Sequence, residues 1–120
     1  IRIRARKLIK PNGVKVYQIW GPLFFGSAQT FQNKFTSQED PDTIEVDFIE
    51  SRVLDHSGIE ALRNVANKYL KLGKKITFTH LSPDCKTLLV KRNPKFQEII
   101  QDNVDDPRYF VVTNQLDTEV

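Results

Sequence analysis

The stretch DHSGIEALRNVANKYLKLG, residues 55–73, contains the strongest local pattern in the chain. Its apolar residues recur at steps of three and four, which places them on one face of a helix, opposite charged and polar side chains. Asp55 is a suitable N-cap and Gly73 supplies a C-terminal stop. We therefore predict one long amphipathic helix over this stretch. Its apolar face consists of Ile59, Leu62, Val65, Ala66, Tyr69 and Leu72.

The residues around this helix predict strands and a second helix. Ser82-Pro83-Asp84 combines an N-cap, a proline in the first turn and an acid near the helix dipole, and Asn93-Pro94 is a stop signal. We expect this second helix to bury Cys85, Leu88 and Leu89. β-branched and aromatic residues predict strands on both sides of the long helix. These strands cover 44–49, 76–81 and 109–113, and a helical turn is expected at 96–100.

The N-terminal residues predict a hairpin and a short helix. Period-two patterns at 1–6 and 14–20 flank Pro11-Asn12-Gly13, which favours a turn between antiparallel strands. Gly21-Pro22 is expected to break the second strand, and the apolar run at 23–25 adds a short strand or an extension. The expected helix has Ser27 as N-cap and Ala28, Phe31 and Phe35 on its apolar face, and the polar loop 36–43 follows it.

Alternating strands and helices indicate a single α/β domain over residues 1–120. We expect a mixed sheet of about five strands, mostly parallel with an antiparallel N-terminal edge, packed with three to four helices. A chain of 120 residues leaves no room for a second domain, and it can bury a core without a disulfide or a metal. Residues 1–13 are expected to form a basic N-terminal strand or a lead-in beside a membrane, and 114–120 a frayed polar tail.

The charge is divided unevenly along the chain. The net charge is +3, but residues 1–38 hold seven bases and no acid, whereas the remainder holds eleven bases and fifteen acids. A basic end fits a solvated face, an anionic membrane surface or nucleic acid. We expect no nucleic-acid partner, because no helix carries a clustered basic face. No apolar run is longer than four residues, far below the roughly 20 that span a bilayer. The chain also begins at Ile1 and contains no methionine, so we expect a piece of a longer protein.

Few residues in the chain suit catalysis or metal binding. With one cysteine, two histidines and no paired ligand spacing, a metal site is not expected, and no glycine-rich loop is present that would cradle a nucleotide. His56 and Ser57 are adjacent in sequence, which is not the arrangement of a nucleophilic triad. We expect His80 to be a surface or partly buried polar residue and Asp47 to be paired or solvent-facing. The sequence therefore predicts no catalytic residue, metal ligand or cofactor.

The turn Asp55-His56-Ser57-Gly58 is the main candidate site. A strand-to-helix turn presents free N–H groups and the positive end of the helix dipole, which favours an anion. Ser57 lies in the first helical turn, where a kinase can reach its hydroxyl. The alternative is that Asp55 and Ser57 only cap the helix. The pair Gly26-Ser27 is a second candidate corner for an anion or nucleotide near this turn, with a tight strand-to-helix connection as its alternative.

Four segments together resemble the STAS domain of the sulfate permease (SulP) family of anion transporters. They are GPLFFGSA at 21–28, IEVDF at 44–48, LDHSGIEAL at 54–62 and GKKITFTHL at 73–81, and the resemblance extends from about residue 14 to residue 113. The LFFGSA segment is the more discriminating one. The Asp-x-Ser-Gly turn is shared with free-standing anti-sigma-factor antagonists, whose fold the STAS domain also resembles.

The resemblance implies a cytoplasmic, non-enzymatic domain at the C-terminus of an integral membrane protein that transports sulfate or a related anion such as bicarbonate. The isolated piece would be soluble. Its partners would be the transmembrane domain of the same protein and a cytosolic regulatory protein. The basic N-terminus, with Arg2, Arg4, Arg6 and Lys7, would lie beside the anionic membrane surface.

In the antagonist branch of the family, a partner kinase phosphorylates the serine that matches Ser57. Asp55 and Gly58 match the acid and the glycine of that turn, whereas His56 replaces the usual second serine and resembles the permease branch. We therefore expect the turn at 55–58, the Gly26-Ser27 corner and the exposed face of the long helix to form a regulatory contact surface. Two other hypotheses stay open: a free-standing antagonist that releases its partner on phosphorylation, and a sensor that binds a purine nucleotide.

Overall fold

The computed structural model describes residues 2–102 and 114–116. Its strands are β1 (Arg4–Ile9), β2 (Lys15–Leu23), β3 (Thr43–Val53), β4 (Lys75–Thr79), β5 (Ile100–Gln101) and β6 (Asn114–Leu116). Its helices are α1 (Ala28–Asn33), α2 (His56–Lys71) and α3 (Pro83–Arg92), followed by the 3-10 helix η1 (Pro94–Ile99). None of these helices combines the length and the apolar character needed to cross a membrane.

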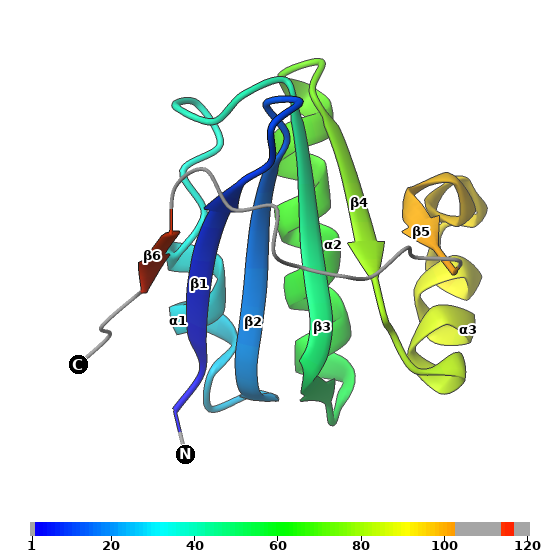
Figure 1. The fold of residues 1–120 in the computed structure, drawn as a ribbon. Coiled ribbons are helices and arrows are strands. Elements are labelled where there is room, and N and C mark those ends of the chain that lie inside the picture. The colour runs from blue at the N-terminus through cyan, green and yellow to red at the C-terminus, as the bar shows by residue number, and fades with distance from the viewer. Residues whose placement is uncertain (1, 103–113, 117–120) are drawn as a thin grey trace.

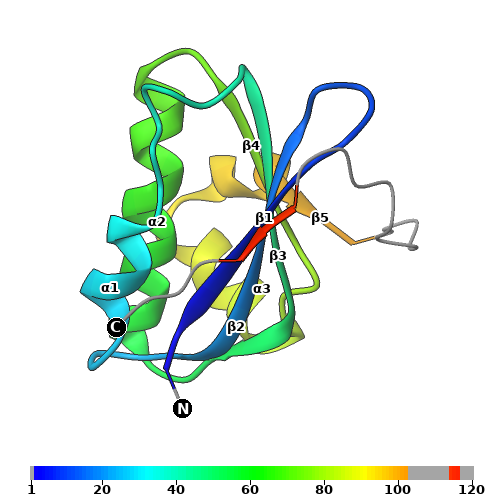
Figure 2. The same cartoon turned by 60° about the vertical axis from the view of Figure 1, so that its left-hand side comes forward.

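The described strands form one mixed sheet in the order β5-β4-β3-β2-β1-β6 (Figure 1). Strands β2 to β5 run parallel, whereas β1 is antiparallel to both of its neighbours, β2 and β6. Helices α1 and α2 cover one face of the sheet (Figure 2). The expected α/β domain with an antiparallel N-terminal edge and a parallel remainder is confirmed.

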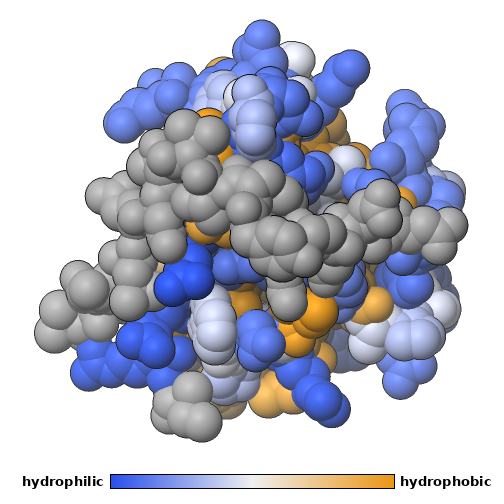
Figure 3. Space-filling model, viewed as in Figure 1, coloured by the Kyte–Doolittle hydropathy of each residue, from blue (hydrophilic) through white to orange (hydrophobic). Residues whose placement is uncertain are grey.

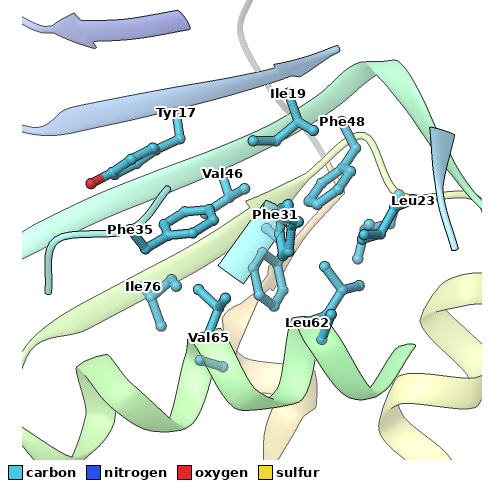
Figure 4. Packing of buried hydrophobic residues seen from close by; sticks show 14 of the residues in the cluster. Tyr17, Ile19, Leu23, Phe31, Phe35, Val46, Phe48, Leu62, Val65 and Ile76 are labelled. Carbon is cyan, nitrogen blue, oxygen red and sulfur yellow. The ribbon is translucent and has the colours of Figure 1, made fainter. Parts of the chain in front are cut away.

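The hydrophobic core lies between this face of the sheet and the helices α1 and α2 (Figure 4). Phe31 and Phe35 fill the middle of it, with ring centroids 5.0 Å apart, and the Phe35 ring lies 4.3 Å from that of Tyr17 on β2. The predicted apolar face of α2 is buried except for Leu72, which is 45% exposed because α2 ends at Lys71. Helix periodicity alone therefore identified the element that closes the core.

Strand β2 continues through Gly21-Pro22, where we expected a break. Gly21 adopts a φ of +92°, and a bulge between Gln18 and Trp20 shifts the register of β2 against β3. β1 begins at Arg4, which lies opposite Trp20, so Pro22 lies beyond the pairing between β1 and β2. The missing N–H of Pro22 therefore removes no hydrogen bond to β1, and the strand tolerates the proline.

Two other expectations differ from the structure. Leu88 is 38% exposed rather than buried, because α3 contacts the core through Cys85 and Leu89. Residues Asn114–Leu116 form β6, where we expected part of a frayed tail. The edge of β1 presents backbone N–H and C=O groups, which bond to a neighbouring strand whatever its side chains are. A polar segment can therefore pair there. The strand expected at 109–113 lies outside the described residues.

A buried polar cluster anchors the loop between α1 and β3. The carboxylate of Asp40 accepts hydrogen bonds from Lys15 Nζ at 2.6 Å, Tyr17 OH at 2.6 Å, Tyr69 OH at 2.5 Å and Thr36 Oγ1 at 2.9 Å. Burial by itself would raise the pKa of Asp40, but the donors, Lys15 foremost, outweigh it and hold this pKa below its ordinary value. The loop between α1 and β3 lies at the end of the sheet opposite the turn at 55–58 (Figure 1).

Candidate functional site

The turn at 55–58 lies between the C-terminal end of β3 and the start of α2, as expected. Asp55 is the N-cap of α2, and its Oδ1 accepts a hydrogen bond from Gly58 N at 2.9 Å. His56 and Ser57 are the first two residues of the helix, and both are exposed. Gly58 is buried, and a Cβ on it would lie 2.9 Å from Leu23 O. The glycine is therefore explained by the close approach of the helix to β2.

The Asp55 carboxylate also connects the two candidate corners. Its second oxygen, Oδ2, accepts a hydrogen bond from Phe25 N at 3.0 Å, and Leu54 N donates to Leu23 O at 2.9 Å. The loop at 24–27 and the turn at 55–58 therefore lie side by side, although 30 positions separate Phe25 from Asp55. We expected the two corners to lie near each other, but no local pattern in the sequence predicted that Asp55 joins them.

Ser27 holds its own loop together rather than the start of α1. It occupies the expected N-cap position but makes no side-chain capping bond, since its φ of −120° and ψ of −1° differ from the extended conformation of a capping residue. Its Oγ donates to Pro22 O at 2.8 Å and accepts from Phe24 N at 3.1 Å. Ser27 is buried, whereas Gly26 beside it is exposed. The corner therefore presents backbone and Phe25 to its surroundings, with the serine hydroxyl turned inward.

A groove opens beside the turn, at the carboxyl ends of β3 and β4. It has a volume of about 1070 Å³ and lies between the first turns of α2 and α3. Ligands of open α/β sheets usually bind at this edge. Its lining mixes apolar and polar side chains, including Ile49, Leu54, His56, His80, Ser82 and Leu88. Within the part of the chain that the structure describes, no group of three or more histidine, cysteine or carboxylate side chains could hold a metal ion.

A histidine–aspartate pair lies at the edge of this groove, and sequence reasoning missed it. His80 follows β4 with a φ of 62°, and its Nδ1 lies 2.6 Å from Asp47 Oδ1. The same buried oxygen accepts hydrogen bonds from Ile49 N at 3.1 Å and Thr79 Oγ1 at 3.2 Å. The pair thus ties the irregular part of β3 to the end of β4. The signal for this pair is the left-handed backbone conformation of His80, and that conformation cannot be read from the sequence.

A family model of the STAS domain matches residues 5–106 of the chain. Over 76 residues the chain is 32% identical to a curated protein of Bacillus subtilis (strain 168) named "Putative sulfate transporter YbaR". This match covers 63% of the chain and 16% of YbaR, so the chain spans a small part of the length of that relative.

Solved structures share the fold. The SulP transporter STAS domain from Vibrio cholerae has a TM-score of 0.56 at 26% identity, over 74% of this chain and 72% of that one. The murine Slc26a9 anion transporter in its inward-facing state has a TM-score of 0.68 at 15% identity, over 87% of this chain and 21% of that one. The Bacillus cell fate determinant SpoIIAA in its phosphorylated form has a TM-score of 0.60 at 15% identity, over 77% and 84%. At 15% identity, the last two show the fold alone.

Proposed function

Because the chain belongs to the STAS domain family, we propose that it is the non-catalytic regulatory and interaction domain of a SulP-family anion transporter. The transporter would carry sulfate or a related anion, and this domain would lie on the cytoplasmic side, against the transmembrane domain of the same protein. The identity to YbaR and to the SulP domain from Vibrio cholerae supports this proposal. The fold shared with part of the Slc26a9 transporter is consistent with it.

The double hydrogen bond of the Asp55 carboxylate carries the regulatory part of the proposal. Through it, the exposed Ser57 stands on a surface built from two segments, the loop at 24–27 and the turn at 55–58. A phosphate on Ser57 would add about −1.5 to −2 charges at the start of α2. The helix dipole would stabilise that charge, but the phosphate would repel Asp55 and compete for the same N–H groups. Modification of one residue would therefore alter both segments of a docking surface for a cytosolic regulator.

Uptake of radiolabelled sulfate and bicarbonate by the full-length transporter tests this proposal. Coupling between a regulatory and a functional site typically changes affinity about fivefold or more. Ser57→Asp should therefore change uptake, or capture of a cytosolic partner, by at least that factor. Ser57→Ala should behave like the unmodified protein. Gln97→Glu adds one charge at an exposed position of η1, away from the turn, and serves as the control. Uptake and partner capture that are both unaffected by Ser57→Asp would rule out regulation through this turn.

A second candidate function is that of a free-standing anti-sigma-factor antagonist. The exposed serine in the first turn of α2 and the fold shared with phosphorylated SpoIIAA favour it. The coding sequence upstream of Ile1 distinguishes the two, because a transporter requires membrane helices there and an antagonist requires a nearby start codon. Calorimetry with GTP and ATP tests the third hypothesis, a nucleotide sensor, which the absence of heat would set aside.

A further inference from the structure

Exposed arginine and large apolar side chains gather at the end of the sheet where β1 begins and β3 ends. We call them the Trp20 surface, and they are Arg2, Arg4, Trp20, Phe25, Arg52 and Leu54. Phe25 is 75% exposed, Leu54 56% and Trp20 37%, and exposed apolar side chains that lie together mark interaction sites. In Figure 3, apolar side chains lie among hydrophilic ones at the lower end of the face, where Figure 1 places the end of β3.

The strand register places these side chains together. Arg4 on β1 lies directly opposite Trp20 on β2, and Arg52 on β3 lies opposite Pro22. Directly opposed residues point to the same face of a sheet. Since Ile19, next to Trp20, points into the core, Arg4 and Trp20 lie on the face away from α1 and α2.

Two further residues extend this surface around the end of the sheet. Phe25 is held by the hydrogen bond from its own N–H to Asp55, and Leu54 is held by the bond from its N–H to Leu23 O. Both bonds involve backbone groups, so the two side chains are presented outward from fixed positions. The carbonyl oxygen of Arg2 packs closely against Gly21, which brings the beginning of the described chain to the same end.

This combination of side chains suits the headgroup region of a lipid bilayer. Aromatic side chains concentrate at membrane–water interfaces, exposed leucine and phenylalanine enter the acyl boundary, and arginines bind lipid phosphates. Among the residues that the structure describes, two acids lie beside the surface: Asp55, which is bonded to two backbone N–H groups, and Glu50, which lies opposite Trp20. The three arginines therefore exceed the acids, which makes the surface complementary to anionic lipid.

We propose that the Trp20 surface docks on an anionic bilayer, with Phe25 and Leu54 entering the interface and the three arginines contacting lipid phosphates. This docking rests on the proposed function, because a transmembrane domain joined before Arg2 would hold this end of the sheet at the membrane. Arginine neutralisation and apolar truncation both weaken such a contact, but only the first should depend on lipid charge.

Vesicle binding of the 120-residue chain tests the docking directly. Trp20 is the single tryptophan, so its emission reports on this surface without a label. We expect a blue shift and co-sedimentation with vesicles of phosphatidylcholine and phosphatidylglycerol, both reversed by salt, and neither with phosphatidylcholine alone. Arg4→Gln and Arg52→Gln should each weaken binding about fivefold. The double variant Phe25→Ser/Leu54→Ser should abolish the blue shift while retaining the far-UV circular dichroism of the fold.

The opposite end of α2 offers a matched control. Leu70 and Leu72 are 42% and 45% exposed there, next to the exposed Lys68 and Lys71. The double variants Leu70→Ser/Leu72→Ser and Lys68→Gln/Lys71→Gln should leave vesicle binding unchanged. Absence of binding to the anionic vesicles, or an equal loss in this control, would overturn the proposal.

A protein partner at this surface would give a different result. Cross-linking of a Phe25→Cys transporter to its own transmembrane domain, without vesicle binding, would assign the surface to that domain and also overturn the proposal. Vesicle binding and the effect of Ser57→Asp on anion uptake are separate measurements. Failure of the lipid docking is therefore distinguishable from failure of the proposed function.

Discussion

At the scale of single residues, Asp55 organises the candidate site. One carboxylate oxygen satisfies the N–H of Gly58 in the first turn of α2, and the other satisfies the N–H of Phe25. Free N–H groups at a helix start and in a tight loop would otherwise require water or another acceptor. The negative charge also complements the positive end of the helix dipole. Asp55 is therefore both a cap and a link between two segments.

Substitutions at Asp55 should separate these two roles. Asp55→Ala removes both bonds and should lower the free energy of unfolding by about 1–2 kcal/mol. Asp55→Asn keeps an oxygen for Gly58 but places a donor group toward Phe25 N–H, so it should cost less and still release the loop. Urea unfolding measures the first effect, and hydrogen exchange of the Phe25 amide measures the second.

The control for this prediction is Asp84→Asn, at an exposed acid in the first turn of α3. This substitution should change the free energy of unfolding by no more than about 0.5 kcal/mol. It should leave the hydrogen exchange of the Phe25 amide unchanged. Full protection of that amide in Asp55→Asn would show that the link is not made by the carboxylate.

At the scale of elements, the packing of α2 against the sheet decides the geometry of the turn. A Cβ on Gly58 would lie 2.8 Å from Val53 Cγ1 on β3 and 2.9 Å from the backbone oxygen of Leu23 on β2. The valine side chain can move, but the backbone oxygen is fixed at the end of its strand. The first turn of α2 therefore sits where only a glycine fits.

Gly58→Ala should destabilise the protein even though alanine is the better helix former. Overpacking costs roughly 1–3 kcal/mol, and this exceeds the gain of at most about 1 kcal/mol in helix propensity. Lys68→Ala, at an exposed position of the same helix, should stay within about 0.5 kcal/mol of the parent. Urea midpoints compare the two variants, and a stability for Gly58→Ala equal to or above that of the parent would contradict this packing argument.

At the scale of the whole molecule, the two ends of the sheet have different roles. One end carries the candidate site and the Trp20 surface, and the other holds the buried Asp40 cluster. Burial, followed by the hydrogen bond to Asp40, raises the pKa of Tyr69, so its hydroxyl remains a donor at neutral pH. The cluster joins β2, α2 and the loop before β3. It therefore stabilises the fold at the end of the sheet that does not carry the candidate site.

Acid should weaken the fold through Asp40. Its pKa is held below the ordinary value of 3.8, so its contribution to stability is complete above pH 3.8 and declines as the pH falls below it. Urea unfolding from neutral pH down to acid should show this loss. Asp40→Asn should remove that part of the pH dependence and should cost about 3–5 kcal/mol, because Lys15 loses its buried partner.

Two further variants keep this prediction testable. Tyr69→Phe removes one donor, should cost about 1 kcal/mol and should reduce the acid loss, in case Asp40→Asn does not fold. Asp42→Asn, at an exposed position two residues along, should leave the profile almost unchanged. A profile that is identical in the parent and in both cluster variants would exclude Asp40 as the group responsible.

Features that depend on neighbouring residues could be predicted from the sequence. The amphipathic period of 55–73 predicted α2, and the period-two segments around Pro11-Asn12-Gly13 predicted the antiparallel edge. Asp55 was identified as the cap because a capping carboxylate acts on residues two or three positions away. Together with the alternation of strands and helices, these signals were sufficient for the α/β fold class.

The sequence by itself thus determined the helices, the strands β1 to β4 and the first turn of α2, but not β5 or β6. Only the tertiary structure decided which distant groups meet: Phe25 with Asp55, His80 with Asp47, and Tyr17 and Tyr69 with Asp40. It also decided that Trp20 and Phe25 are exposed. The physical reason is that these outcomes depend on strand register, on the bulge in the β2–β3 pairing and on the left-handed residues Gly21 and His80. Such features arise when several elements pack at once, and no local period encodes them.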